Sequence, residues 1–292
     1  MYNKIRKGFT LLELSIVILV IAGMIVAISG SKEVLKKSRI ANARNLTQQS
    51  IVNILSDDLI TWFETSLDSS FLASEQKNDG TKITKWFDNN KNPNQKNIAT
   101  APASSNNQPT FIYRGFYDSI PAVRFDGDDY LSYDGSKLVN SSYTIFVVEQ
   151  RRSNKIDNYF LAGSSSSKNQ NLVLGYRSNN VITQAHWNND IDVSVKNYST
   201  PTPAIHTFIY NNLIGKKYNI SGPVVASSSN NSSENLNPLT SYLNARLGYS
   251  SATNSYYVGD LAEIIIFKRS LKTEEVNAIR NYLGSKYGIP VS

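Results

Sequence analysis

The first part of the chain is dominated by one apolar run. Residues 9–28 carry a single charged side chain, Glu13. A helix of this length rises about 30 Å, which is the thickness of a bilayer's hydrocarbon core. Lys4, Arg6 and Lys7 precede the run, and such a basic flank predicts that the N-terminus stays in the cytoplasm. We therefore predict a membrane-spanning helix over residues 9–29.

The helical pattern continues beyond the apolar run. No Pro and no internal Gly interrupt residues 31–57, so we predict an outer amphipathic part over residues 30–57. The whole helix then spans residues 9–57, and its outer half should lie against a globular domain. The apolar positions that recur at helical spacing are Val34, Leu35, Ala41, Leu46, Ile51, Ile54 and Leu55.

From residue 58 onward the pattern changes to short β-type runs. Runs rich in Val, Ile, Tyr, Phe and Thr alternate with Asn, Ser and Gly loops, and residues 143–150 have the length of a central strand. Thr273 is a plausible cap for a closing helix that ends at Gly288. The predicted fold is a long N-terminal membrane-spanning α-helix followed by an all-β antiparallel jelly-roll sandwich over residues 58–292, with a short C-terminal helix. The other expected strands are 59–64, 82–88, 122–126, 130–133, 159–163, 172–176, 181–187, 191–195, 205–211, 216–220, 245–248 and 260–269.

Composition narrows the chemistry. The 292 residues are 40% hydrophobic and 18% charged, so the chain can bury a core and is not disordered as a whole. The absence of Cys excludes disulfide scaffolds, thiolate zinc sites and cysteine nucleophiles. Two His argue against a histidine relay. The formal net charge is +7, but no long Lys/Arg cluster occurs, so nucleic-acid binding is not indicated.

The N-terminal segment resembles that of type IV pilins and type II secretion pseudopilins. The resemblance rests on the basic leader ending in Gly8, on Phe9 and Glu13, and on the apolar helix that follows. It implies that prepilin peptidase removes residues 1–8 by cutting between Gly8 and Phe9, and that Phe9 is N-methylated. Glu13 would then pair with the new amine of a neighbouring subunit in an apolar bundle and set the register of assembly. The implied partners are other pilin or pseudopilin subunits and the inner-membrane assembly platform.

Residues 59–288 resemble the LamG-like, concanavalin A-like domains of bacteria. This resemblance implies a two-sheet jelly roll and little about chemistry, because folds of this kind host many functions. The matching pieces are Trp62–Phe63, residues 83–88, residues 120–131, residues 143–148, residues 259–267 and the terminal helix.

Four carboxylates crowd one predicted turn: Asp126, Asp128, Asp129 and Asp134. Hard oxygen ligands at such spacing are suited to calcium. The same residues also read as a hairpin in which Gly127 supplies a positive φ and the Asp side chains cap the turn. Calcium is therefore the one candidate cofactor, and it competes with a purely structural interpretation.

No catalytic motif emerges. Neither E-x-D-x-E nor G-x-S-x-G occurs, and Glu263 stands alone, so we expect no catalytic residues and no enzyme activity. His186 beside Trp187 is either a sugar-site residue or a packed sheet residue, and the latter interpretation also fits His206. The residues that flank a Ser/Asn loop and are candidates for binding are Tyr249, Tyr256 and Tyr257.

These observations predict a prepilin-type minor pilin or pseudopilin whose sandwich binds a glycan or a protein. We expect it in the bacterial inner membrane with its head outside the cytoplasm, and later in a pilus or pseudopilus. One alternative is a membrane-anchored adhesin or lectin that never polymerises. Another is a glycan hydrolase on the sandwich fold.

Overall fold

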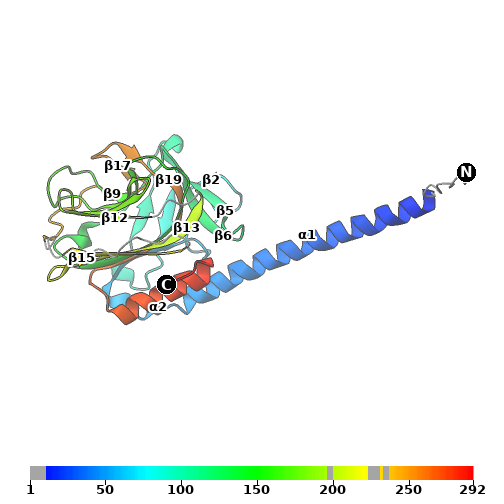
Figure 1. Cartoon of the computed structure of the whole chain (residues 1–292), viewed down its shortest axis with the longest axis horizontal. Coiled ribbons are helices and arrows are strands. Elements are labelled where there is room, and N and C mark those ends of the chain that lie inside the picture. The colour runs from blue at the N-terminus through cyan, green and yellow to red at the C-terminus, as the bar shows by residue number, and fades with distance from the viewer. Residues whose placement is uncertain (1–10, 196–199, 223–230, 233–236, 292) are drawn as a thin grey trace, which may run out of the picture.

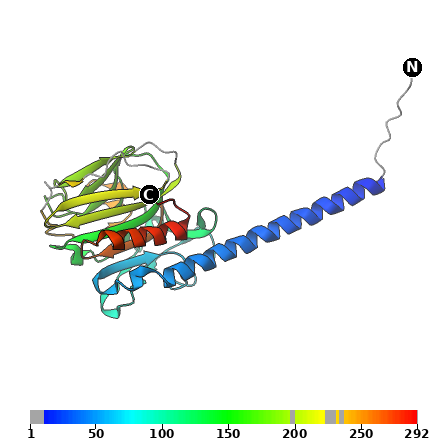
Figure 2. The same cartoon turned by 60° about the horizontal axis from the view of Figure 1, so that its bottom comes forward.

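The structure is a computed structural model and describes residues 11–195, 200–222, 231–232 and 237–291. Two antiparallel sheets pack face to face, and two helices lie together against one of them (Figures 1 and 2). A long helix, α1 (Leu11–Gln48), enters this arrangement at its C-terminal end and projects away from it at the other. The β-sandwich with a C-terminal helix is thus as the sequence predicts.

We refer to the nine-stranded sheet as sheet A and to the eight-stranded sheet as sheet B. The central strand of sheet A, β8 (Tyr143–Arg151), is buried along its whole length because the second sheet covers one face and helices cover the other. The order of its strands is β15 (Asn231–Ser232), β14 (Gly215–Ser221), β13 (Thr202–Asn211), β8, β19 (Val258–Phe267), β6 (Ile120–Asp126), β5 (Thr110–Phe116) and β2 (Thr81–Lys82), with β1 (Leu59–Glu64) paired to β19.

Sheet B packs on the inner face of sheet A and shares its apolar core. Between the sheets lie side chains such as Ile145, Val147, Leu161, Leu174 and Phe208, all with no exposed surface. The order of its strands is β12 (Asp190–Ser194), β11 (Val181–Ala185), β10 (Val173–Ser178), β9 (Asn158–Ala162), β16 (Arg246–Leu247), β7 (Leu131–Ser132), β4 (Ile98–Thr100) and β3 (Lys85–Phe87). A hairpin outside both sheets joins β17 (Tyr249–Ser250) to β18 (Ser255–Tyr256).

Helix α2 (Thr273–Tyr287) covers the outer face of sheet A. Val276, Ile279 and Leu283 pack into a second apolar layer, as their helical spacing predicts. Lys272 rather than Thr273 occupies the cap position, where its backbone N–H donates to Glu275 Oε2 at 2.8 Å. Gly288 ends the helix with a φ of 65°, a conformation that glycine adopts without strain.

The C-terminal end of α1 is fixed to the sandwich by polar contacts. Arg44 Nε donates to the Ser66 carbonyl at 2.7 Å, and Thr47 Oγ1 lies 3.3 Å from the Tyr282 hydroxyl of α2. The helix stops at Gln48 rather than at residue 57, because Ser50 caps a separate short turn, η1 (Ile51–Asn53). Four more short 3₁₀ turns are η2 (Ser56–Asp58), η3 (Pro93–Gln95), η4 (Ser105–Asn107) and η5 (Ser136–Leu138).

The predicted membrane-spanning helix is contradicted. Across residues 11–195, 200–222, 231–232 and 237–291, no helix is both long enough and apolar enough to cross a membrane. Glu13 lies near the start of α1, and charged residues recur from Lys32 onward. The expected single-pass location in the inner membrane is therefore wrong for the part of the chain that the structure describes. Among the side chains that the structure describes, the exposed large apolar ones of the projecting part are Leu11, Leu14, Ile16, Val17, Ile18, Leu19, Val20, Ile21, Met24, Val34 and Leu35.

Candidate functional site

The outer face of sheet B carries a pocket of about 230 Å³. Neither helix covers this face, since both pack on the side of sheet A (Figure 2). We call this cavity the sheet B pocket. It is lined by Asp157, Tyr159, Val173, Arg177, Ala185, Trp187, Asn188, Asp190 and Thr253.

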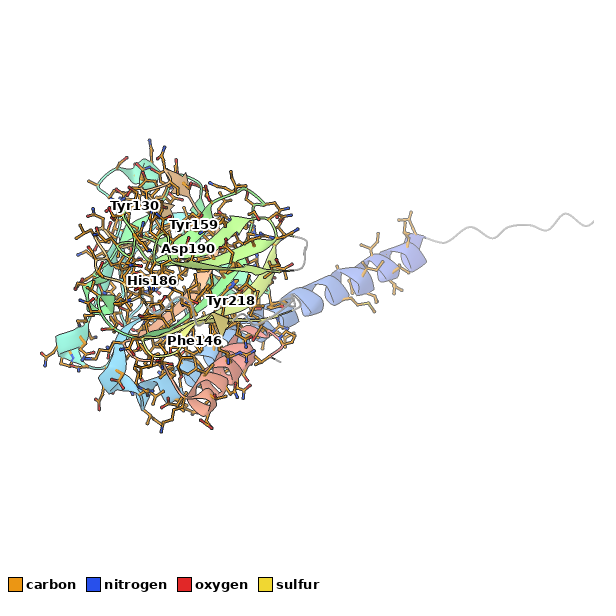
Figure 3. The ribbon with its side chains drawn as sticks, turned by 60° about the vertical axis from the view of Figure 1, so that its left-hand side comes forward. Tyr130, Phe146, Tyr159, His186, Asp190 and Tyr218 are labelled. Atoms are coloured by element: carbon orange, nitrogen blue, oxygen red, sulfur yellow. The ribbon has the colours of Figure 1, made fainter. Side chains whose placement is uncertain are left out.

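Tyr159 forms the aromatic floor of the pocket. It is the second residue of β9 and packs outward with Ala162, Val173 and Ala185, because Phe160 and Leu161 both turn inward to the core. Its hydroxyl donates to Asp157 Oδ1 at 2.6 Å. Burial raises the pKa of Tyr159, and the bond to Asp157 raises it further, so the phenol stays neutral. Figure 3 shows Tyr159 beside Asp190 on this side of the molecule.

Trp187 stands at the tip of the hairpin that joins β11 to β12. The His186 N–H donates to the Asn189 carbonyl at 3.1 Å, which closes a two-residue turn. Trp187 and Asn188 at the centre of this turn have φ values of 54° and 58°, as in a type I′ hairpin. Asn tolerates this conformation, whereas for a bulky indole it is strained. Strain of this kind is typical of positions held for a purpose other than stability.

Charged groups form one wall of the pocket. Arg177 donates from Nη2 to Asp190 Oδ2 at 2.7 Å and to Thr183 Oγ1 at 3.0 Å, and its Nη1 lies 3.3 Å from Asp192 Oδ2. The guanidinium is thus shared between two carboxylates. The wall as a whole carries excess negative charge and fixed hydrogen-bonding groups.

Two buried polar atoms in the lining have no hydrogen-bond partner among the residues that the structure describes: Arg177 Nε and Thr253 Oγ1. A buried donor or acceptor left unpaired costs about 1–3 kcal/mol. Neither atom has exposed surface, so a ligand with hydroxyl groups can pair with both only if the lining side chains shift, while its apolar face packs on Tyr159 and Trp187. Apolar walls with a few fixed polar groups are typical of small-molecule sites.

Cavities of about 450, 440, 320 and 270 Å³ are larger than the sheet B pocket, and the two largest are less suited to this role. One, of about 450 Å³, lies at the end of α1, where its Trp62 is only 2% exposed and Asp88 is already satisfied by three backbone N–H groups, those of Trp62, Asn90 and Asn97. The other, of about 440 Å³, lies between α2 and strands β13 and β14 and has no aromatic side chain in its lining. Size alone therefore does not identify the site.

The predicted carboxylate cluster is assembled in part. Oxygens of Asp126, Asp128 and Asp129 all lie within 4.8 Å of one another, whereas Asp134 instead accepts from the Ser136 N–H at 2.9 Å. Asp129 Oδ2 accepts from the Asp126 N–H at 3.0 Å, which is the turn interpretation, and Asp129 Oδ1 has no hydrogen-bond partner among the described residues. Lys82 Nζ lies 3.9 Å from that oxygen. These three residues could hold a calcium ion, and the calcium site stays a prediction.

Both histidines are buried rather than placed in the pocket. His186 Nε2 lies 3.0 Å from the Tyr143 hydroxyl, and burial lowers the pKa of His186 to about 3. His206 lies in the core beside Glu149. Tyr257 is also fully buried, whereas Tyr249 and Tyr256 remain half-buried.

Glu263 is not isolated. It accepts from Trp62 Nε1 at 2.7 Å, the Tyr282 hydroxyl at 2.8 Å, Lys286 Nζ at 2.8 Å and the Tyr287 hydroxyl at 2.9 Å. With four donors from β1 and α2 and no exposed route to solvent, its role is to hold α2 to the sheet.

The residues of the predicted processing site are not tested. Gly8 and Phe9 lie outside the described residues, and Glu13 lies in α1 with its side chain outside the description. The cleavage, methylation and register roles thus stay predictions.

Most of the sheet B pocket is absent from the sequence prediction, which singled out only Trp187 within it, beside His186. Tyr159, Arg177 and Thr253 come from three separate segments, and no short motif unites them. One feature of the sequence could have pointed to the pocket. The stretch His-Trp-Asn-Asn places a bulky Trp where a turn between two predicted strands is expected.

Comparison with known proteins shows similarity of fold only. No protein-family model matches the chain, and no curated protein matches it either. A GH54 α-L-arabinofuranosidase soaked with a cyclic sulfate inhibitor is 12% identical, with a TM-score of 0.53, over 80% of this chain and 60% of that one. A variant of a GH54 arabinofuranosidase soaked with a nitrophenyl arabinofuranoside is 11% identical, with a TM-score of 0.52, over 72% of this chain and 52% of that one. Trypanosoma rangeli sialidase has a TM-score of 0.45 and 12% identity over 78% of this chain.

The chain spans between a third and three fifths of the length of these proteins. Their names contradict two expectations. The neighbours with TM-scores above 0.5 are named as arabinofuranosidases and not as pilins, and the described residues contain no helix apolar enough to span a membrane, so the assignment to a pilin or pseudopilin fusion is wrong. The expectation that the chain is not an enzyme is also contradicted, because its fold neighbours are glycoside hydrolases. At this level of identity the similarity establishes the sandwich fold.

Proposed function

We propose that the chain binds a glycan in the sheet B pocket. The observation that carries this proposal is the convergence of two aromatic side chains, Tyr159 and Trp187, with the two unpartnered polar atoms, Arg177 Nε and Thr253 Oγ1. A sugar ring presents C–H groups on its faces and hydroxyls around its edge. The C–H groups can pack on the aromatic surface, and the hydroxyls can pair with the buried polar atoms once the lining side chains shift.

The fold supports this proposal. The neighbours with TM-scores above 0.5 are named as arabinofuranosidases, so sandwiches of this kind act on carbohydrates. A second candidate function follows from Asp157 and Asp190, whose side chains line the same pocket. A pair of carboxylates flanking a sugar is the usual equipment of a glycosidase. Hydrolysis therefore belongs in the same test as binding.

The test is binding of the full chain to an immobilised panel of neutral, amino and acidic glycans. We expect at least one glycan to be retained, and Trp187→Ala and Thr253→Val to weaken that retention by about tenfold or more, equivalent to about 1.4 kcal/mol. Thr253→Val keeps the shape of the side chain and removes only the hydroxyl. Leu213→Ala is the matched control, since Leu213 is 83% exposed in the β13–β14 turn, away from the pocket.

Each outcome has a defined meaning. Binding that survives both pocket variants would place the ligand elsewhere, and retention of no glycan would end the proposal. Sugars released from a bound glycan, with release abolished by Asp157→Asn or Asp190→Asn while binding persists, would make the pocket catalytic.

A further inference from the structure

Three tyrosines form an aromatic surface beside the sheet B pocket. The Tyr249 and Tyr256 rings stack at a centroid distance of 4.2 Å and an angle of 22°, and the Tyr130 ring lies 5.6 Å from that of Tyr249. The Arg246 guanidinium packs on two of the rings, 4.9 Å from the centroid of Tyr130 and 5.1 Å from that of Tyr249. We call Tyr130, Tyr249 and Tyr256 the tyrosine platform. All three are half-buried.

The platform and the pocket share one face of the sandwich. Arg246 pairs with Ala162 of β9, and Ala162 packs with the Tyr159 that forms the pocket floor. The β17–β18 hairpin packs over β9, and Thr253 in its turn lines the pocket. Figure 3 shows Tyr130, Tyr159 and Asp190 following one another along this side of the molecule.

The segment that connects the two places is rich in unpaired polar atoms. Arg246 Nε, Ser250 Oγ, Ser251 Oγ and Thr253 Oγ1 are all buried without a hydrogen-bond partner among the described residues. Ser250 has no exposed surface at all. Buried polar groups are normally paired, so these exceptions mark a segment whose hydrogen bonding is incomplete. None of the four atoms has exposed surface, so a ligand with hydroxyl groups can pair with them only if the side chains of this segment shift.

The charges along this face select the ligand further. Arg177 is already shared between Asp190 and Asp192, and Arg246 rests on tyrosine rings. Asp157 lines the pocket, and Asp128 is exposed in the turn that precedes Tyr130. Lys155 adds a third cation, since its Nζ donates to the Tyr256 carbonyl at 2.5 Å. The four carboxylates still outnumber the three cations, and like charges repel an acidic ligand. The surface therefore favours an uncharged molecule.

We propose that an uncharged oligosaccharide binds across this face, with one sugar in the sheet B pocket and a later sugar of the same chain on the exposed face of Tyr256. This inference rests on the proposed function and adds the length and the charge class of the ligand. The ring contact at Tyr249 occupies one face of Tyr256, and the proposed sugar packs on the remaining accessible surface of this half-buried ring.

The test compares short and long ligands. The probes are the di- and hexasaccharides of cellulose, xylan, mannan and arabinan, with a polygalacturonate hexasaccharide as the acidic control, titrated into the full chain by calorimetry. We expect one neutral hexasaccharide to bind about tenfold more tightly than its disaccharide, a gain of about 1.4 kcal/mol. Tyr256→Ala should remove that gain and leave disaccharide binding unchanged. Tyr256→Phe keeps the ring and should retain it, and thermal unfolding of both variants confirms that the hairpin is folded.

The outcomes separate this inference from the proposed function. Equal affinity for short and long neutral ligands, or an equal loss of both in Tyr256→Ala, overturns the second subsite and leaves the pocket in place. Tighter binding of the polygalacturonate probe overturns the charge class. Failure of every probe to bind overturns this inference, whereas the proposed function falls only if the wider glycan panel also shows no retention.

Discussion

Glu149 and His206 face each other in the closed interior of the sandwich, with Oε1 of the carboxylate 3.0 Å from Nε2 of the imidazole. The Tyr218 hydroxyl lies 2.8 Å from His206 Nδ1, and the hydroxyls of Tyr176 and Tyr257 each donate to Glu149 at 2.6 Å. Because Tyr176 lies in β10 and the other residues belong to the sheet A side, this network joins the two sheets.

Glu149→Gln should therefore destabilise the fold. The amide keeps the volume but brings an NH₂ group where two hydroxyls and a ring nitrogen require an acceptor, so at least one buried group loses its partner. We expect the free energy of unfolding in urea to fall by about 1–3 kcal/mol. Glu274→Gln, at an exposed position on α2, is the control and should change it little. An unchanged urea midpoint in Glu149→Gln would show that the network contributes nothing to stability.

Lys286 should be the most sensitive position on α2. Its ammonium lies 2.9 Å from Glu64 Oε2 and 2.8 Å from Glu263 Oε2, and all three side chains have no exposed surface. Lys286→Met leaves two buried carboxylates unpaired, a change that costs about 3–5 kcal/mol. Chemical unfolding at neutral pH measures this loss. A cost below that of an ordinary surface substitution would refute the role assigned to the cluster.

The contributions of Glu64 and Lys286 to stability depend on pH, because folding shifts the pKa values of both groups. Burial would raise the pKa of Glu64, but Lys286, Ser66 and Ser70 outweigh it and hold the pKa below its usual value. Burial would lower the pKa of Lys286, but Glu263 and Glu64 raise it. The stability from Glu64 is thus present above the unfolded-state pKa of about 4.3 and disappears as the pH falls through the lowered value. That from Lys286 is complete below about 10.4 and disappears as the pH rises through the raised value.

The titration of Asp129 should make the folded protein less stable as the pH rises. Burial raises the pKa of Asp129 to about 7, and the neighbouring Asp126 contributes to this shift. The folded protein then binds a proton that the unfolded chain has already lost above about pH 4, so stability falls as the pH rises from about 4 to 7. Asp129→Asn removes this dependence, and its melting temperature should exceed that of the original chain by more at pH 8 than at pH 5.

Calcium distinguishes the two interpretations of the same turn. If Asp126, Asp128 and Asp129 hold the ion, millimolar calcium should raise the melting temperature of the original chain at pH 8 and leave that of Asp129→Asn unchanged. An identical melting temperature with calcium and with a chelator would leave the carboxylates as turn residues alone.

The projecting part of α1 should be dispensable for folding of the head. Among the described side chains, contacts with the sandwich begin near Lys36, whose Nζ lies 2.9 Å from Asp118 Oδ2, and continue through Arg44 and Thr47. Deleting residues 1–35 should change the free energy of unfolding by less than about 1 kcal/mol, because the one described ion pair near the cut is partly exposed. The deletion should also reduce self-association, since exposed apolar surface promotes it. Sedimentation of both forms at equal concentration tests this expectation, and an unfolded head would contradict it.

The sequence predicts the strands correctly where both faces of a strand are buried. Residues 143–150 and 260–269 correspond to β8 and β19, whose apolar runs are buried on both faces. Val276, Ile279 and Leu283 were placed correctly on the buried face of α2, because helical spacing and burial agree there. The strand expected over residues 181–187 ends instead at Ala185, because the turn begins where Trp187 takes a positive φ.

The candidate site was not predictable because it depends on register. Strict alternation would place Tyr159 and Leu161 on one face of β9, but the pairing with β10 shifts between Leu174 and Gly175. Phe160 and Leu161 then both face the core, and Tyr159 turns outward to the pocket. A one-residue irregularity of this kind changes which side chains share a face and leaves no trace in the local sequence.

Tryptophan fluorescence of the full chain during glycan titration tests the central claim most directly. Trp62 and Trp86 are 2% and 0% exposed in the described structure, so Trp187 is the indole that a ligand can reach. We expect a saturable change in emission with a neutral oligosaccharide, and the loss of that change in Trp187→Phe. A glycan that binds by calorimetry without altering the emission, or an emission change that persists in Trp187→Phe, would contradict the assignment of the sheet B pocket.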